Sequence, residues 1–247
     1  MSCSFNFSDK KVLVTGASQG LGYEICKSLS NLNAKVFALA RNREKLEALA
    51  KEHTNIVPIV GDVTETKEEL EKILAEHQPF DFLINNAAIA HMESALEATV
   101  KNLDEMYQVN VRGPIIIAEI VAKEMIAHEI KGSIVNVSSQ SGLRPLHDRI
   151  GYSSSKAALD MVTRVQAREW GIHGIRVNSV NPTVIILEQG LGVWSDSDKA
   201  KWMRDQLPLK KFAAGKDVIN AILFLLSDAS ALTTGLAFPV DGGYSSQ

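Results

Sequence analysis

The sequence has few cysteines and no long apolar segment. Only Cys3 and Cys26 occur among 247 residues and they form no CxxC pair, which argues against a disulfide framework or a thiolate metal site. The longest apolar runs, "IIIAEIVA" and "AILFLL", are far shorter than the roughly 20 residues of a membrane-spanning helix. The start, "MSCSFNFSDKK", lacks the apolar core of a signal peptide. We therefore expect reduced thiols, no membrane span and a cytoplasmic location.

Positive charge is not in excess either. The chain has 26 Lys and Arg against 29 Asp and Glu, a net charge of −3, and no dense basic tract. Nucleic acid and anionic membranes are therefore not predicted partners. The six histidines are scattered without the spacing of metal ligands, so we predict no metal site.

Short apolar runs alternate with amphipathic stretches along the whole chain. Nearly continuous apolar runs are typical of strands covered on both faces. Seven of them are predicted strands: 11–15, 35–40, 55–60, 81–85, 133–138, 176–182 and 236–241. Helical patterns such as "REKLEALAKEH" and "TKEELEKILAEH" lie between them, and no linker or repeat divides the chain. The prediction is α/β: one domain over 1–247, a Rossmann-type doubly wound, seven-stranded parallel sheet with helices on both faces.

A glycine-rich turn, "TGASQGLG" (15–22), follows the first strand and opens a helix. Gly16 permits a tight turn, Gly20 lets the backbone approach a pyrophosphate, and Gly22 lets the helix pack on the sheet. Because the pattern begins a strand–helix–strand unit, it indicates a dinucleotide site; a plain strand–helix turn is the alternative.

The end of the second strand predicts which nucleotide binds. NAD sites place an acid there, whereas NADP sites use arginine for the 2′-phosphate. The chain reads "ALARNR", so Ala40, Arg41 and Asn42 occupy the region and favour NADP(H); Arg41 merely solvating the strand end is the alternative. Asp62, in "GDV" after the third strand, is a candidate acceptor for the adenine amino group.

Two stretches share a tyrosine followed four residues later by a lysine: "GYEICK" (22–27) and "GYSSSK" (151–156). In the first helix, Tyr23 and Lys27 fall about 200–240° from the apolar stripe, which predicts a surface pair. Tyr152 and Lys156 sit at the edge of a wide apolar arc. A nearby ammonium would lower the pKa of a half-buried phenol by at most about three units, towards the range of a useful general acid.

With these residues the chain resembles the short-chain dehydrogenase/reductase family. Its motifs occur in family order over nearly the whole length: TGASQGLG, NNAA (85–88), YQVNVRG (107–113), GSIVNVSSQSG (132–142), YSSSK (152–156) and NPTVI (181–185). The resemblance implies a nicotinamide dinucleotide, NADP(H), as the cofactor. The cofactor-binding residues that we predict are Gly16, Ser18, Gln19, Gly20, Leu21, Gly22, Ala40, Arg41, Asn42, Asp62, Val63, Asn86, Ala87, Tyr152, Lys156, Pro182, Thr183 and Val184.

The same resemblance implies the catalytic roles. Tyr152 delivers a proton, Lys156 also binds the nicotinamide ribose, and Asn110 holds a water that relays protons to Lys156. Ser139, thirteen residues before Tyr152, hydrogen-bonds the substrate carbonyl. Ser138 is the neighbouring candidate, and the spacing favours Ser139.

Within the family the chain resembles tetrameric reductases of small α-dicarbonyls and of ketoses such as L-xylulose. "NNAA", "IVNVSSQ", "VNPTV", "WSDSDKAK" (194–201), "NAILFLLSDAS" (220–230) and "TTG" (233–235) carry this resemblance. Two features depart from it. Gln19 stands where relatives often have a basic residue that binds the 2′-phosphate. This difference weakens the predicted preference for NADP. "RPLHDRIGY" (144–152), expected to border the substrate pocket, differs as well.

The substrate pocket is expected at the carboxyl edge of the sheet, with 183–210 as its loop region. Candidate substrate residues are Ser139, Gln140, His147, Arg149, Tyr152 and Trp194, with lid packing as the alternative for Trp194. Another alcohol or 3-oxoacyl dehydrogenase on the same scaffold and a catalytically silent nucleotide sensor are the rival functions.

We expect helices over 104–128 and 151–171, and each carries more apolar surface than one face of the sheet can cover. Such a surplus predicts burial against other subunits, in a homotetramer with the carboxyl-terminal 237–247 at a second interface. A monomer that packs these residues under loops is the alternative.

Overall fold

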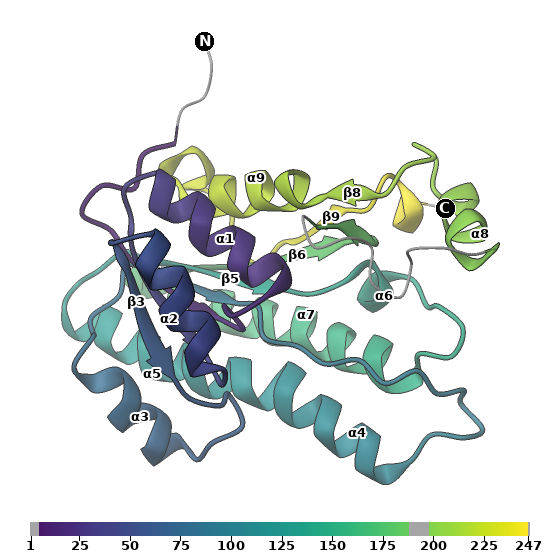
Figure 1. The fold of residues 1–247 in the computed structure, drawn as a ribbon, viewed down its shortest axis with the longest axis horizontal. Coiled ribbons are helices and arrows are strands. Elements are labelled where there is room, and N and C mark those ends of the chain that lie inside the picture. Colours follow the sequence, from purple (N-terminus) through teal and green to yellow (C-terminus); the bar gives the residue numbers. More distant parts are fainter. Residues whose placement is uncertain (1–4, 188–197, 247) are drawn as a thin grey trace.

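A computed structural model of the chain describes residues 5–187 and 198–246. The main sheet has seven strands, all parallel, in the order β3-β2-β1-β4-β5-β6-β9 (Figure 1). Their bounds are β1 Lys11–Thr15, β2 Lys35–Ala40, β3 Ile56–Val60, β4 Phe82–Asn85, β5 Ser133–Val137, β6 Arg176–Pro182 and β9 Ala237–Val240. The predicted fold class and all seven predicted strands are confirmed, to within a residue at each end.

The helices alternate with the strands along the chain. Their bounds are α1 Gly20–Asn31, α2 Arg43–Glu52, α3 Lys67–Ala75, α4 Val100–Tyr107, α5 Gly113–Ala127, α6 Gln140–Leu143, α7 Ile150–Trp170, α8 Asp198–Gln206 and α9 Gly215–Leu226. Three short 3₁₀ turns follow helices or end the described chain: η2 Gly171–His173, η4 Asp228–Ser230 and η5 Tyr244–Ser246. A two-stranded sheet of β7 Ile185–Ile186 and β8 Ala213–Ala214 was not predicted, because two-residue strands carry no periodic signal.

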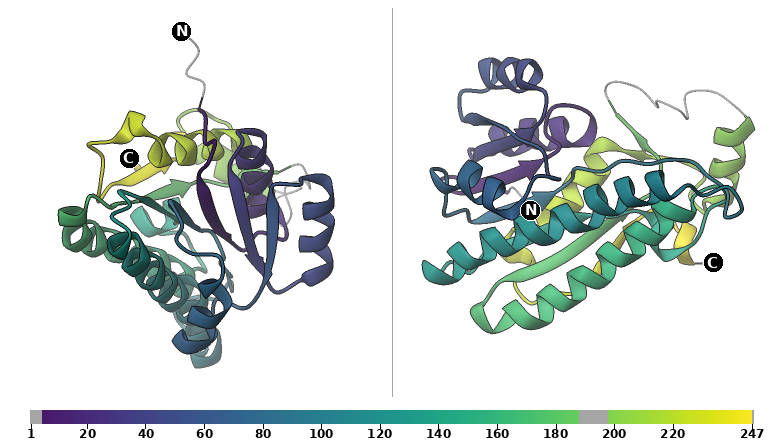
Figure 2. Two further views of the ribbon diagram at one scale, coloured as in Figure 1. Left: turned by 90° about the vertical axis from the view of Figure 1, so that its left-hand side faces the viewer. Right: turned by 90° about the horizontal axis from the view of Figure 1, so that it is seen from below.

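Successive side chains of each central strand point to opposite faces of the sheet, because a strand has a period of two residues. In β1, Val12 and Val14 join a core with α1, α2 and α9, whereas Leu13 joins a second core with α3, α5 and α7. The two views in Figure 2 show these helices as separate layers on either side of the strands. Burial on both faces explains why the strands read as continuous apolar runs.

The helical segment predicted over 104–128 is not one regular helix. A π-helical turn, η1 Gln108–Arg112, joins α4 to α5. The apolar residues of this segment also pack mainly inside the subunit. Met106, Ile117, Val121 and Met125 have no exposed surface, and Ile126 is 36% exposed. The predicted surplus of apolar surface on this segment is therefore wrong, because the second core and α7 cover most of it.

The chain order reverses between β1 and β4. From β1 the chain proceeds through β2 to β3 on one side, then returns to β4 and continues to β9 on the other. Helices on both sides of such a reversal diverge, so the carboxyl ends of β1 and β4 flank a natural binding crevice. Over 5–187 and 198–246, no helix combines the length and apolar character that a membrane crossing demands.

Candidate active site

The glycine turn connects β1 to α1 at the reversal point. Gly16 and Gly20 have φ values of +66° and +60°, which side chains disfavour. A Cβ atom on Gly22 would lie 2.3 Å from the carbonyl oxygen of Gly16, so only glycine allows α1 to pack this closely. Asn86 Nδ2 donates to the carbonyl oxygens of Thr15, at 3.0 Å, and Gly16, at 3.3 Å. This geometry agrees with the tight turn predicted at Gly16 and the close packing predicted at Gly22, whereas the approach of a pyrophosphate to Gly20 stays a prediction.

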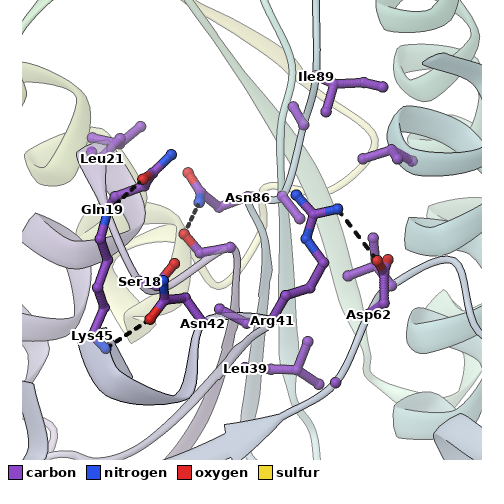
Figure 3. A pocket seen from close by; sticks show the side chains of 18 residues that line it. Ser18, Gln19, Leu21, Leu39, Arg41, Asn42, Lys45, Asp62, Asn86 and Ile89 are labelled. Carbon is purple, nitrogen blue, oxygen red and sulfur yellow. Dashed lines mark hydrogen bonds and ion pairs between the residues drawn. The ribbon is translucent and has the colours of Figure 1, made fainter. Parts of the chain in front are cut away.

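A cavity of about 640 Å³ extends from this turn along the carboxyl ends of β1, β2 and β3 (Figure 3). Twelve of the predicted cofactor residues line it: Gly16, Ser18, Gln19, Gly20, Leu21, Ala40, Arg41, Asn42, Asp62, Val63, Asn86 and Ala87. Gly22 packs behind the turn instead. The prediction missed further lining residues: Leu39, Lys45, Gly61, Ala88, Ile89 and Val109.

Lys45 is the most informative of the missed residues. It lies in the first turn of α2, where Asn42 Oδ1 accepts a hydrogen bond from its backbone N–H at 2.9 Å. Its Nζ atom reaches back across the cavity wall and donates to Gln19 Oε1 at 3.0 Å (Figure 3). The sequence does not distinguish a cavity-lining lysine in a helix with alternating charges, because most lysines in such a helix only face solvent.

Arg41 and Asp62 face each other on the opposite side of the cavity (Figure 3). The Nη1 atom of Arg41 lies 3.5 Å from Asp62 Oδ2, and the Arg41 side chain is 76% exposed. Asp62 Oδ1 accepts hydrogen bonds from the backbone and hydroxyl of Thr64 at 2.9 and 2.8 Å, which fixes the carboxylate. An exposed ion pair of this kind is worth little, so Arg41 can exchange Asp62 for another anion.

These features fit a dinucleotide with a phosphorylated ribose. No side chain in the described residues caps the amino terminus of α1, where Gln19 is the N-cap residue. The first N–H groups of α1 are thus available to a pyrophosphate. At the carboxyl end of β6, Thr183 Oγ1 is buried without a hydrogen-bond partner among the described atoms, and a carboxamide would satisfy it.

The catalytic candidates gather where β5 and α7 meet. The Ser139 side chain lies close enough to Tyr152 to lower its pKa, and its Oγ accepts a hydrogen bond from the Ser141 N–H at 3.1 Å. Ser138 Oγ instead donates to the backbone carbonyl of Lys156 at 3.2 Å. The structure thus places Ser139, and not Ser138, against the phenol.

Lys156 is only 1% exposed, and its Nζ donates to the Val137 carbonyl oxygen at 2.8 Å. This atom also lies 5.8 Å from the centre of the Tyr152 ring. Burial lowers the pKa of Lys156 to about 8, and the charge of Asp160 counteracts this effect. The lysine and the tyrosine therefore share one buried corner, one helical turn apart.

The prediction that Lys156 lowers the pKa of Tyr152 is wrong for this structure. Burial is the largest influence and raises the pKa of Tyr152, while the hydrogen bond from Ser139 and the charge of Arg149 lower it less. The Arg149 guanidinium lies 5.9 Å from the centre of the Tyr152 ring. The cation that lowers the pKa of Tyr152 is therefore Arg149, the residue that precedes α7, and not Lys156.

Asn110 connects the catalytic corner to the cavity. It lies in the π-helical turn and is fully buried. Its side chain accepts from the Ile89 N–H at 2.9 Å and donates to the Ile89 carbonyl at 2.9 Å and to Ser155 Oγ at 3.1 Å. Ile89 lines the cavity, and Ser155 lies beside Lys156 on α7. The amide thus fixes the turn; the water relay stays a prediction.

The remaining candidates do not all join this site. Gln140 is buried next to Ser139, and its Oε1 has no partner among the described atoms. His147 is exposed, and Trp194 lies outside the described residues. Pro182 and Val184 do not line the cavity: Pro182 pairs with β9, and Val184 packs on the cluster around Met203.

The second tyrosine–lysine pair lies elsewhere. Tyr23 packs partly against the first core, and its hydroxyl donates to Glu52 at 3.3 Å. Lys27 Nζ lies 5.3 Å from the centre of the Tyr23 ring. Neither residue lines the cavity, so identical spacing produces a half-buried pair beside α2 and, in α7, a half-buried tyrosine with a buried lysine.

Comparisons with known proteins agree with this geometry. A family model described as "short chain dehydrogenase" matches residues 10–188. An L-xylulose reductase of Caenorhabditis elegans is 51% identical over 99% of both chains. A D-erythrulose reductase of Gallus gallus is 43% identical, again over 99% of both chains. The crystal structure of a gluconate 5-dehydrogenase from Burkholderia cenocepacia, in complex with NADP and tartrate, is 25% identical with a TM-score of 0.92 and covers 99% of this chain and 98% of its own.

Proposed function

The chain belongs to the short-chain dehydrogenase family, oxidoreductases that act on CH–OH and C=O groups, and we propose that it is an NADPH-dependent reductase of small ketoses and α-dicarbonyls, L-xylulose among them. One observation carries the proposal. Ser139 lies close enough to Tyr152 to lower its pKa, beside the buried Lys156, and Asn110 joins this corner to the dinucleotide cavity.

The chemistry follows from what each group can do. Bound NADPH supplies the hydride for the carbonyl carbon. Ser139 and Tyr152 present two hydroxyl groups to one oxygen, so they can hold a ketone oxygen and stabilise the charge that develops on it. Tyr152 remains protonated at neutral pH because burial raises its pKa, which suits a proton donor. The charge of Arg149, which lowers the pKa of Tyr152, favours the phenolate that remains after transfer, and Lys156, one helical turn away, would bind the nicotinamide ribose.

The preference for NADPH is proposed on the charges around the ribose end of the cavity. Arg41 and Lys45 both line this cavity, and neither belongs to a buried ion pair. A 2′-phosphate would draw Arg41 from its exposed contact with Asp62 and would meet the Lys45 ammonium beside Gln19. Lys45 thereby supplies the positive charge that Gln19 lacks. No acid stands at the end of β2 to favour NADH.

The substrate class is proposed on the relatives and on the polar surroundings of Tyr152. The two curated relatives described above are named for ketoses, L-xylulose and D-erythrulose. In this chain, Gln140 follows Ser139 in the sequence and has a buried amide oxygen without a partner among the described atoms, and the Arg149 guanidinium lies 5.9 Å from the centre of the Tyr152 ring. Polar groups at these positions suit a substrate that carries a hydroxyl or a second carbonyl next to the reacting ketone.

A substrate panel tests the proposal. Loss of NADPH absorbance is followed with L-xylulose, diacetyl and an acetoacetyl thioester in turn. The proposal expects the highest kcat/KM for L-xylulose or diacetyl. A clear preference for the thioester would favour a 3-oxoacyl reductase, and NADPH binding without turnover of any carbonyl would favour a nucleotide sensor.

We also propose a homotetramer in the cytoplasm. On α7, Met161 is 54% and Val165 is 46% exposed, on a helix whose other face packs against the sheet. Near the carboxyl end, Leu232 is fully exposed and Leu236 is 39% exposed. Two separate apolar surfaces suit the two different interfaces of a closed tetramer. The described cysteine, Cys26, is buried and unpaired, which suits a reducing compartment.

A further inference from the structure

Asp160 is a buried carboxylate that the catalytic roles above do not use. It lies on α7 four residues after Lys156, so both side chains project from the same side of the helix. Asp160 is 4% exposed and Lys156 is 1% exposed. Carboxylates are almost never buried to this extent unless other groups compensate their charge.

Two side chains from β6 satisfy the carboxylate. Ser179 Oγ donates to Oδ1 and Asn181 Nδ2 donates to Oδ2, both at 2.8 Å. Burial raises the pKa of the Asp160 carboxyl, and these hydrogen bonds and the charge of Lys156 oppose the rise. Because both oxygens act as acceptors, the arrangement suits the ionised form, whose two oxygens accept hydrogen bonds and donate none.

The same network reaches the catalytic serine. Asn181 Nδ2 also donates to the backbone carbonyl oxygen of Ser139 at 3.1 Å. Ser138 Oγ donates to the backbone carbonyl oxygen of Lys156 at 3.2 Å. Asp160 on α7 is therefore bonded directly to β6 and, through Asn181, to the backbone of Ser139 after β5.

Few charged groups act on Tyr152 and Lys156. The cation that faces Tyr152 is Arg149, which precedes α7, and the charge that acts on Lys156 is the Asp160 carboxylate. The groups that face this pair from the sheet are uncharged: the Val137 carbonyl of β5 and, on β6, Ser179 and Asn181. Within the described residues, Asp160 is thus the counter-charge for the lysine.

We propose that Asp160 is a positioning residue that keeps Lys156 protonated at the working pH and holds Ser139 in register with Tyr152. The inference rests on the proposed roles of Tyr152 and Lys156 in carbonyl reduction. Burial disfavours the ammonium of Lys156, whereas the neighbouring carboxylate favours it. Without that carboxylate, the lysine loses its proton at a lower pH, and a positive charge 5.8 Å from the centre of the Tyr152 ring is lost with it.

Asp160→Asn tests the proposal, because it removes the charge and nearly preserves the shape. Glu169→Gln is the matched control: it makes the same change on the same helix at an exposed position. Two quantities are measured for each variant. The first is the pH profile of kcat/KM for L-xylulose reduction. The second is the titration of Lys156 by NMR of the ¹³C-labelled lysine side chains, with its signal identified by its absence in Lys156→Met.

We expect the alkaline limb of the wild-type profile near the Lys156 pKa of about 8. In Asp160→Asn, the limb and the NMR titration should both move to lower pH by about one unit. Glu169→Gln should leave both unchanged. Lys11, whose pKa is also lowered by burial, serves as an internal reference that should not move. If Asp160→Asn does not fold, Asp160→Ser keeps a small polar group without the charge and should give the same shift.

The outcomes separate this inference from the proposed function. A variant that unfolds at lower temperature but keeps the wild-type Lys156 titration would show a purely structural role and overturn the inference. A wild-type enzyme that reduces no ketose would contradict the proposed function, and the NMR titration would still decide the role of Asp160.

Discussion

The Nζ atom of Lys45 lies 3.0 Å from Oε1 of Gln19, so the first turn of α2 touches the glycine turn across the edge of the cavity (Figure 3). The glutamine stands where a basic residue would strengthen NADP binding, and a lysine from a different element brings its charge to the same place. We therefore propose that cofactor preference in this chain depends on two elements packed together, not on one motif.

Lys45→Ala should raise the Kd for NADPH about tenfold, with a much smaller change for NADH, because a charge-assisted contact with the 2′-phosphate is lost. Binding is measured by calorimetry, and 2′,5′-ADP and 5′-AMP serve as additional ligands. Lys51→Ala, on the last turn of the same helix, is the control and should leave both affinities unchanged. Equal losses for NADPH and NADH would mean that Lys45 does not contact the phosphate.

Arg41→Ala should likewise raise KM for NADPH far more than KM for NADH. Ala40→Asp should move the preference towards NADH, because a carboxylate at the end of β2 repels the 2′-phosphate. A wild-type enzyme that prefers NADH would refute the interpretation of both residues.

Tyr152→Phe should lower kcat at least 100-fold, since a positioned general acid contributes about 10²–10⁴ in rate. The Kd for NADPH, measured by fluorescence, should stay close to the wild-type value because only a hydroxyl is removed. Tyr23→Phe is the control at the solvent side of α1 and should be nearly silent. Comparable losses of activity in both variants would contradict the assignment.

Thr183→Val should change stability and cofactor binding in opposite directions. The buried Thr183 hydroxyl has no partner among the described atoms, so its removal should raise the free energy of unfolding by about 1 kcal/mol. The Kd for NADPH should rise several-fold because the carboxamide loses its partner. Denaturant unfolding and calorimetry measure the two effects.

Thr163→Val is the contrasting control. Its hydroxyl donates to the Leu159 carbonyl at 2.9 Å and accepts from Asn136 at 2.8 Å. Its loss should lower stability by about 1–3 kcal/mol and leave NADPH binding unchanged. If Thr183→Val destabilises the protein to the same extent, the hydroxyl has a partner within the folded chain.

Met161→Glu together with Val165→Glu should dissociate the proposed tetramer, because the charges fall on the exposed apolar side of α7. Light scattering at micromolar concentration should give about four times 27 kDa for the wild type and a smaller particle for the variant. Leu96→Glu, at an exposed loop position, should leave the particle size unchanged. A wild-type mass of 27 kDa would reject the tetramer, and a dimer would reject one of its two interfaces.

The sequence predicted the seven strands of the main sheet well because each is covered on both faces and reads as a continuous apolar run. The apolar stripe of the first helix predicted that Tyr23 and Lys27 face solvent, whereas both are half-buried and Tyr23 packs partly against the first core. Tyr23 indeed lies away from the cavity and Tyr152 beside Ser139.

Other features depend on packing that no local pattern carries. Lys45 reaches the site only because α2 packs against the glycine turn, and Asp160 matters only because β6 brings Ser179 and Asn181 to it. The pKa of Tyr152 was predicted from one neighbouring charge, whereas burial has the larger effect in the folded chain.

The most direct measurement of the central claim is hydride transfer from NADPH deuterated at the reactive ring position to L-xylulose. We expect xylitol with one deuterium on the former carbonyl carbon, one NADPH consumed for each xylitol, and no product from Tyr152→Phe. Absence of labelled xylitol from a folded wild-type enzyme that binds NADPH would refute the proposed function.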